Sequence, residues 1–174
     1  MSASSIRNGL DRLYDVSSWA AALMMVGTLL MVVLGMLDRY VSLSFRGTDM
    51  YAGYCMAAAG FLALAHTLKK NEHIRVTLLL NAVAPKAKKA LELWSLSAAV
   101  LLSGLFCFYS IKLAYQSWDF NDISTGNDAT PLWIPQIGMA AGTLVLLIAF
   151  VDELVLEFLG QRVTSSSDEA LHNE

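Results

Sequence analysis

Four long stretches of the chain carry no Asp, Glu, Lys or Arg. They cover residues 19–37, 51–68, 93–111 and 131–151. At a rise of about 1.5 Å per residue, each stretch matches the roughly 30 Å hydrocarbon core of a bilayer. In lipid, only helices and closed barrels satisfy their own backbone hydrogen bonds, and these stretches lack the alternation of a barrel strand. The pattern predicts an all-α membrane protein with four transmembrane helices.

Composition and the placement of aromatic residues agree with this prediction. Only 16% of the residues are charged and 56% are hydrophobic, whereas a soluble domain carries about 25% charged residues. Tryptophan prefers the headgroup level of a bilayer. All four tryptophans stand at or just outside the ends of the apolar stretches: Trp19, Trp94, Trp118 and Trp133.

The distribution of Lys and Arg predicts the orientation of the helices. One side of the membrane would carry most of these residues, and the positive-inside rule assigns that side to the cytoplasm. We therefore expect both termini and the middle connection to be cytoplasmic. The residues on that side are Arg7, Arg12, Lys69, Lys70, Arg75, Lys86, Lys88, Lys89 and Arg162, against Arg39, Arg46 and Lys112 on the other.

The connection between the second and third helices contains an amphipathic segment, residues 72–84. It is too short to span, and His73, Thr77 and Asn81 recur at the spacing of one helical face. Pro85 ends it and three lysines follow. We expect a helix lying in the cytoplasmic interface and anchored to anionic lipid headgroups, with a simple extension of the second helix as the alternative.

The chain is expected to hold one domain. Residues 1–160 form the four-helix transmembrane domain, and residues 161–174 form a polar cytoplasmic tail without fixed structure.

Residues that carry chemistry are scarce in the apolar stretches. No acidic residue stands mid-span, as an exporter would need. His66 is the one histidine within a span, and Cys55 and Cys107 form no metal or disulfide motif. There is no basic tract for nucleic acid. We expect no catalytic residue, no metal ligand and no cofactor in this chain. The alternatives are a redox membrane anchor that binds haem or quinone and, less favoured, a self-contained channel or exporter.

Small residues recur at four-residue spacing in three of the predicted helices. Such residues let helices approach closely in lipid, either inside a bundle or against a partner. The candidates for helix packing are Gly53, Ala57, Ser95, Ala99, Ser103, Gly138 and Gly142.

Three motifs resemble the small membrane subunit of TRAP transporters (tripartite ATP-independent periplasmic transporters, DctQ type). The clearest is the run from Lys69 to Val76, KKNEHIRV, directly after the second span. The Arg39–Tyr40 pair and the TPLWIPQ run ending at Gln136 are also similar. The family often opens its second helix with a tryptophan and an acid, where this chain has Asp49 and Tyr51.

The resemblance implies a non-enzymatic scaffold subunit in the bacterial inner membrane. Its partners would be a large elevator-type membrane subunit that binds sodium and an organic acid, a periplasmic substrate-binding protein, and membrane lipids. The candidates for contact with the large subunit or lipid are Arg39, Glu72, His73, Arg75, Lys86, Lys88 and Lys89. The candidates for periplasmic docking are Arg46, Asp49, Asp119, Asp122 and Asp128.

Overall fold

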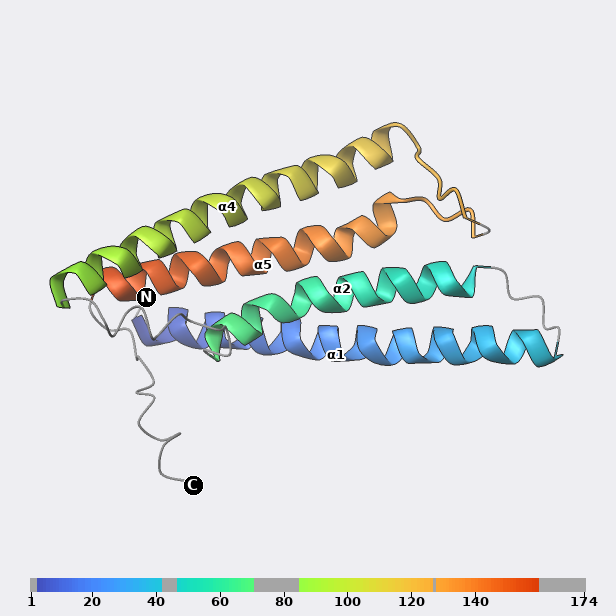
Figure 1. Cartoon of the computed structure of the whole chain (residues 1–174), viewed down its shortest axis with the longest axis horizontal. Helices are drawn as coiled ribbons and strands as arrows, with labels where there is room; N and C mark the ends of the chain where they lie inside the picture. The colour runs from blue at the N-terminus through green and yellow to red at the C-terminus, as the bar shows by residue number, and fades with distance from the viewer. Residues whose placement is uncertain (1–2, 42–46, 71–84, 127, 160–174) are drawn as a thin grey trace, which may run out of the picture.

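The computed structural model describes residues 3–41, 47–70, 85–126 and 128–159. These residues form four helices: α1 (Ala3–Val41), α2 (Thr48–Lys69), α4 (Pro85–Asp119) and α5 (Trp133–Phe158) (Figure 1). All four are long and apolar enough to cross a membrane. The prediction of an all-α membrane protein with four transmembrane helices is confirmed. The interfacial segment 72–84 and the tail 161–174 lie outside the described residues, and the orientation and domain bounds stay predictions.

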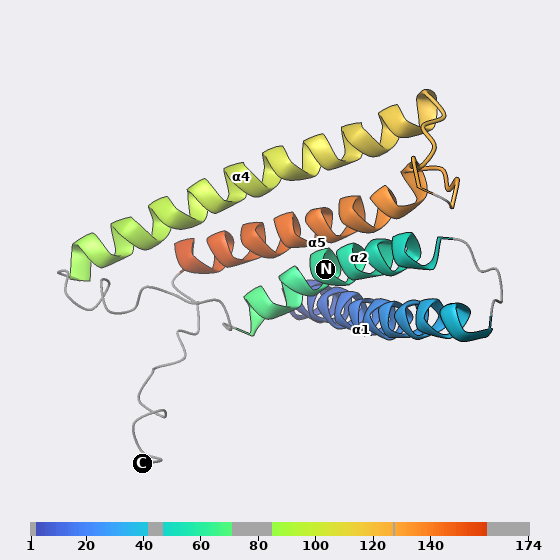
Figure 2. The ribbon, with the colours of Figure 1, turned by 45° about the vertical axis from the view of Figure 1, so that its right-hand side comes forward.

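The helices stand side by side in a single layer. α1 packs along α2, α2 along α5 and α5 along α4, while α1 reaches α5 only weakly. Two views show the same order, with α1 and α4 at the two edges (Figures 1 and 2). The small residues at the helix contacts therefore pack neighbouring helices of a single layer, and not the interior of a bundle. We call the side where α1 begins and α5 ends the terminal side, and the side of residues 120–132 the loop side.

The two edge helices are longer than the apolar stretches within them. α1 has 39 residues and α4 has 35, which correspond to about 58 Å and 52 Å at the standard helical rise. α1 already includes Arg7, Asp11, Arg12 and Asp15 ahead of its apolar part. Charged side chains outside the hydrocarbon core are compatible with a helix, so an uncharged run marks the span and not the ends of the helix.

Many of the side chains at the contacts between neighbouring helices are small. On α4 the buried residues Leu96, Ser103, Ser110 and Ser117 recur every seven residues, with Cys107 between them. On α1 the buried residues Tyr14, Ser17 and Ala21 are spaced by three and four. This is the spacing of a knobs-into-holes seam, in which two helices cross at a small angle. The outward faces carry large apolar residues such as Leu23, Leu29 and Leu102.

α5 begins two residues later than its predicted span. Pro131 lies before the helix and forms an isolated antiparallel bridge with Ile123. Pro135 occupies the first turn of α5, where a missing backbone N–H costs little. Because of this bridge, the chain is extended just before α5. The absence of charged residues from 131 to 151 did not predict this.

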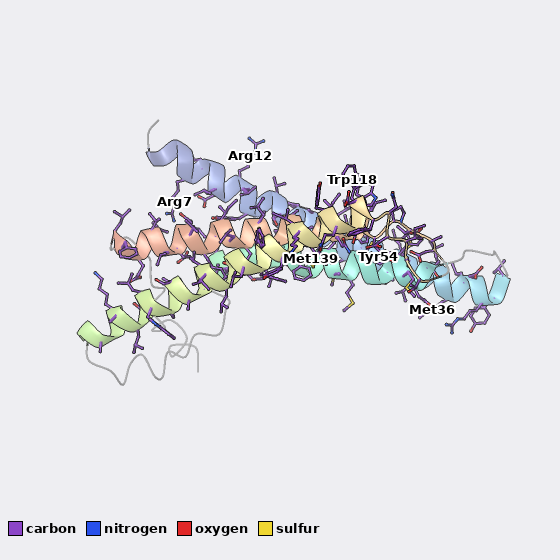
Figure 3. The ribbon with its side chains drawn as sticks, turned by 90° about the horizontal axis from the view of Figure 1, so that it is seen from above. Arg7, Arg12, Met36, Tyr54, Trp118 and Met139 are labelled. Carbon is purple, nitrogen blue, oxygen red and sulfur yellow. The ribbon has the colours of Figure 1, made fainter. Side chains whose placement is uncertain are left out.

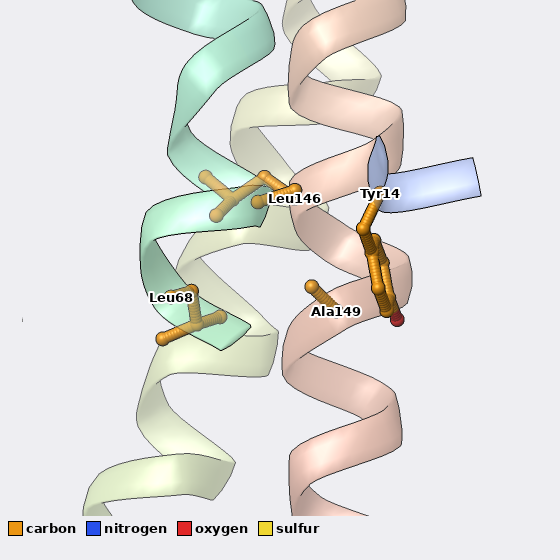
Figure 4. Packing of buried hydrophobic residues seen from close by; sticks show 5 residues of the cluster. Tyr14, Leu68, Leu146 and Ala149 are labelled. Atoms are coloured by element: carbon orange, nitrogen blue, oxygen red, sulfur yellow. The ribbon is translucent and has the colours of Figure 1, made fainter. Parts of the chain in front are cut away.

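The buried core of the layer lies toward the terminal side, where three helices meet. Tyr14 of α1, Ala65 and Leu68 of α2, and Leu146 and Ala149 of α5 form one cluster. Figure 4 shows Leu68, Leu146, Ala149 and the Tyr14 ring gathered between these helices. Apolar burial at this point joins α1 to the pair α2–α5 in addition to its long contact with α2.

Candidate functional site

A cluster of hydroxyl and carboxylate groups fastens the 120–132 segment to α2. We call Tyr51, Tyr54, Ser124, Asp128 and Thr130 the loop-side cluster. The Ser124 hydroxyl donates to Asp128 Oδ1 at 2.7 Å, and the Tyr54 hydroxyl lies 3.2 Å from Asp128 Oδ2. The Thr130 hydroxyl donates to the Tyr51 oxygen at 2.9 Å. Two aromatic residues of α2, one turn apart, thus hold a segment some 70 residues further along the chain.

The segment is also closed by its own backbone. Ser124 N–H donates to the Thr130 carbonyl at 2.8 Å, and Leu132 N–H donates to the Asp122 carbonyl at 3.0 Å. Asn121 and Ala129 take the left-handed conformation, with φ of 51° and 49°, which is uncommon for residues other than glycine. These bonds and turns fold the segment into a compact hairpin, so the loop-side cluster presents a fixed surface.

Asp128 is the centre of the loop-side cluster. The hydrogen bond from Ser124 stabilises the carboxylate and is the main cause that lowers the pKa of Asp128 below its ordinary value. Gly47, at the start of α2, has φ of 85°, and a Cβ there would lie 2.6 Å from Asp128 Cβ. Glycine is therefore favoured at position 47 for two reasons: the backbone is left-handed there, and the 120–132 segment lies too close to α2 to leave space for a side chain.

A second cluster joins α2 to α5 on the terminal side. We call Tyr14, Lys69, Asp152 and Glu153 the terminal-side cluster. Lys69 Nζ lies 2.7 Å from Asp152 Oδ2 and 4.0 Å from Glu153 Oε1. The side chains are mostly buried, with exposed fractions of 20% for Lys69, 12% for Asp152 and 9% for Glu153. Ionisable groups buried near a membrane are costly and are retained for a role.

Tyr14 brings α1 into the terminal-side cluster. The residue is 2% exposed, and Lys69 Nζ lies 5.6 Å from the centroid of its ring. A cation over an aromatic face at this distance is attracted by the ring. The Tyr14 hydroxyl is buried without a hydrogen-bond partner among the described residues. The cluster thus joins α1, α2 and α5 with one lysine and two carboxylates at its centre.

Two further contacts fasten α1 to α2 nearby. The Ser17 hydroxyl donates to the Leu62 carbonyl at 2.6 Å. His66 Nδ1 lies 3.9 Å from Asp15 Oδ1. His66 is therefore placed in a contact between two helices. Among the described residues, no group of three His, Cys, Asp or Glu gathers in a way that could hold a metal ion.

The predicted packing glycines of α5 lie against α2. A Cβ on Gly138 would lie 2.9 Å from the Ala58 Cβ, and one on Gly142 would lie 2.6 Å from the Phe61 carbonyl carbon. Gly53 and Ala57, by contrast, are exposed and line an apolar groove along α2 of about 500 Å³, together with Met56, Gly60, Phe61 and Leu64.

The three packing candidates on α4, which are Ser95, Ala99 and Ser103, do not all lie on its buried face. Ser103 is buried, whereas Ser95 is exposed and Ala99 is half-buried. Residues at strict four-residue spacing rotate around a helix with 3.6 residues per turn. The buried face follows the seven-residue repeat instead, so Leu96 and not Ser95 lies at the contact.

The candidates for contact with lipid or the large subunit are only partly described. Arg39 and Lys89 are exposed at opposite ends of the layer. Lys86 and Lys88 belong to the first turn of α4, and their side chains lie outside the description. Glu72, His73 and Arg75 fall outside the described residues. Figure 3 shows other cations, Arg7 and Arg12, at the end opposite to Tyr54 and Trp118.

The candidates for periplasmic docking gather on the loop side. Asp49, Asp119 and Asp122 are exposed, whereas Asp128 is half-buried in the loop-side cluster. Arg46 lies outside the described residues. Asp128 therefore holds the 120–132 segment in place, whereas Asp119, the last residue of α4, and Asp122 of the segment are exposed.

The sequence singles out Asp128 as a docking candidate, but it does not predict the contacts that form the two clusters. Lys69 is predicted to lie in the basic connection after the second span, and Asp152 and Glu153 follow directly after the fourth uncharged stretch. The signal available in the sequence was a basic residue, Lys69, just after one span and an acidic residue, Asp152, just after another. Their pairing across 83 positions depends on α2 and α5 being neighbours. Tyr54 lies near the start of the second span, where an aromatic residue is expected at the headgroup level, but nothing in the sequence indicates its contact with Ser124.

Comparison with known proteins identifies the family. The chain matches the family described as tripartite ATP-independent periplasmic transporters, DctQ component, over residues 16–160. Among curated proteins, none matches the chain. The match covers α2, α4, α5 and most of α1, so the resemblance found in the sequence is confirmed. Proteins of this family work within tripartite transporters that have a large membrane subunit and a periplasmic binding protein. The chain belongs to the DctQ family and is an inner-membrane, small-subunit component of a TRAP transporter.

Proposed function

We propose that this chain is the rigid scaffold of its transporter, lying beside the fixed part of a large elevator-type subunit during sodium-driven uptake of an organic acid. The observation that carries the proposal is the single layer α1–α2–α5–α4 with α2 fastened at both ends. On the loop side α2 holds Asp128 through Tyr54. On the terminal side it holds Asp152 through Lys69.

A layer suits a supporting role better than a transport pathway. A pathway through one chain needs polar groups enclosed between helices near the midplane. In the described part of the chain, the two clusters stand at the two ends of the layer, and the buried contacts between them are made by apolar residues, serines and Thr143. A layer one helix thick also offers two broad faces, one for a partner and one for lipid.

The orientation proposed from the basic residues assigns the loop side to the periplasm. The outward-facing Asp119 and Asp122 would then meet the soluble binding protein, and the terminal side, with Lys89 and the connection that precedes α4, would meet the cytoplasmic headgroups. Cys55 and Cys107 are first replaced by alanine, and single cysteines at Asp122 and Lys89 are then treated with a membrane-impermeant maleimide on intact spheroplasts. Labelling of the Asp122 position alone is expected, and labelling of the Lys89 position alone would reverse the orientation.

The scaffold role is tested with three vesicle preparations: this chain alone, the large subunit alone, and both together. Each receives the binding protein, an inward sodium gradient and a panel of labelled mono- and dicarboxylic acids. Uptake is expected only when both membrane subunits are present, and it should collapse when the sodium gradient is removed. Sodium-dependent uptake by vesicles that hold this chain alone would refute the scaffold role.

A further inference from the structure

Lys112 is the one charged residue of α4 between Leu93 and Trp118. It stands seven residues before Asp119, the end of the helix, which is about 10 Å along the helix axis. Its side chain is exposed, and within the described part of the chain it has no ion-pair or hydrogen-bond partner. A cation at this depth needs a counter-charge, because an ammonium in hydrocarbon is costly and marks a functional position.

An apolar groove runs between α4 and α5 beside this lysine. This open groove has a volume of about 350 Å³ and is lined by Ile111, Ala114 and Tyr115 of α4 and by residues of α5 that include Ile137, Ala141 and Leu144. The alanines are small, so they leave space between the larger side chains. Tyr115 follows Lys112 by three residues, a spacing at which side chains on a helix are neighbours, so Lys112 lies next to the α4 edge of the groove.

The aromatic residues at this end of α4 indicate how deep the groove lies. Tyr115 and Trp118 are 61% and 58% exposed, with ring centroids 6.1 Å apart. Such exposed amphipathic rings lie at the level of lipid headgroups. The groove therefore begins at that level and continues into the hydrocarbon region. The long stem of Lys112 can carry its ammonium up to the headgroups along Tyr115.

We propose that this groove is a binding site for an anionic phospholipid of the loop-side leaflet. One acyl chain lies in the apolar groove, and the ammonium of Lys112 donates to the headgroup phosphate. The charge of Lys112 selects an anionic lipid over a zwitterionic one, since a zwitterionic headgroup supplies its own cation to its phosphate. A phospholipid carries both an acyl chain for the groove and a phosphate for Lys112, at the depth where the groove and the lysine lie next to each other. The inference needs only that the chain spans the membrane, and it is independent of the scaffold role.

The test measures lipid retained by the purified full-length chain in native mass spectrometry. Phosphatidylglycerol and phosphatidylcholine with the same acyl chains are titrated separately. We expect one phosphatidylglycerol to bind at least roughly tenfold more tightly than phosphatidylcholine, as a charge-assisted contact supplies. Lys112→Gln should remove this preference, and Ala141→Phe, which fills the groove from an exposed position, should weaken the binding of both lipids.

Lys89→Gln is the matched control, because Lys89 is an exposed lysine near the other end of the same helix. It should leave the preference unchanged, and circular dichroism should show that all variants keep their helices. The proposal is overturned if Lys112→Gln keeps the full preference for phosphatidylglycerol. It is also overturned if Lys112→Gln binds lipid normally but lowers recovery of the complex with the large subunit, because Lys112 would then pair with a protein carboxylate.

Discussion

Lys69 of α2 and Asp152 of α5 form an ion pair of 2.7 Å across 83 positions of the chain. At the same point the buried ring of Tyr14 brings α1 into contact with α2 and α5. The ion pair therefore fixes the terminal ends of three helices relative to one another, while Asp128 fixes the opposite end of α2 to the 120–132 segment.

Replacement of Lys69 by methionine should destabilise the layer. Asp152 would keep its charge in a site that is only 12% exposed, without its cation. Removing one partner of a fully buried pair costs about 3–5 kcal/mol, and partial exposure lowers the expected loss to about 2 kcal/mol. Detergent-induced unfolding followed by circular dichroism measures it. The double variant Lys69→Met, Asp152→Leu should recover most of the loss, and a double variant less stable than Lys69→Met would contradict the pairing.

Gly142→Ala should separate α2 from α5. A Cβ at position 142 would lie 2.6 Å from the Phe61 carbonyl carbon and 2.7 Å from the Phe61 carbonyl oxygen, so backbone has to move. We expect a loss of about 1–3 kcal/mol in the same unfolding assay. Gly53→Ala is the control: it has nothing within 4 Å and should be neutral or up to about 1 kcal/mol stabilising. Equal effects at the two positions would argue against the close contact.

The loop-side cluster should weaken in acid. The pKa of Asp128 is lowered, chiefly by the hydrogen bond from Ser124. A carboxyl group with a lowered pKa contributes stability above its ordinary pKa of about 4, and that contribution is lost as pH falls through the lowered value. Amide protection of Asp122, Ser124 and Leu132, whose N–H groups are hydrogen-bonded, should be constant from about pH 5 to 8 in hydrogen exchange corrected for the intrinsic rate, and should decrease below about pH 4.

The same carboxylate can be probed by substitution. In Ser124→Ala, a carboxyl ¹³C titration should find the pKa of Asp128 nearer its ordinary value, because the principal stabilising donor is gone. Thr125→Ala, at an exposed neighbouring position, should leave that pKa unchanged. If Ser124→Ala left the pKa where it is in the parent chain, Ser124 would not be the cause.

Gly47→Ala should release the 120–132 segment from α2. Position 47 has φ of 85°, and a Cβ there would lie 2.6 Å from Asp128 Cβ, so the substitution combines backbone strain with a clash. Hydrogen exchange of Ser124 and Leu132 amides, which bond across the hairpin, should report whether the hairpin itself survives. Exchange at the start of α2 should rise, and unchanged protection there would contradict the role assigned to Gly47.

The sequence predicted the helices better than their contacts. A span is a local property, because 18–21 uncharged residues determine it alone. The first residue of α5 was harder to predict, because Pro131 forms a bridge with Ile123 and therefore lies outside the helix. Among the α4 candidates chosen by strict four-residue spacing, Ser103 is buried and Ser95 is exposed, because a contact inside the layer follows a mixed spacing of three and four. Lys69 and Asp152 could be paired only once the order of the helices in the layer was known.

The most direct test of the scaffold is the distance between its two edges during transport. Spin labels at Leu23 of α1 and Leu102 of α4, both exposed, are measured by pulsed electron paramagnetic resonance in the reconstituted complex. The distance distribution is recorded without ligand and then with sodium, substrate and binding protein. A rigid scaffold predicts one distribution that shifts by less than about 2 Å between the conditions. A larger shift that follows substrate or sodium would mean that the layer itself moves, and the scaffold account would fail.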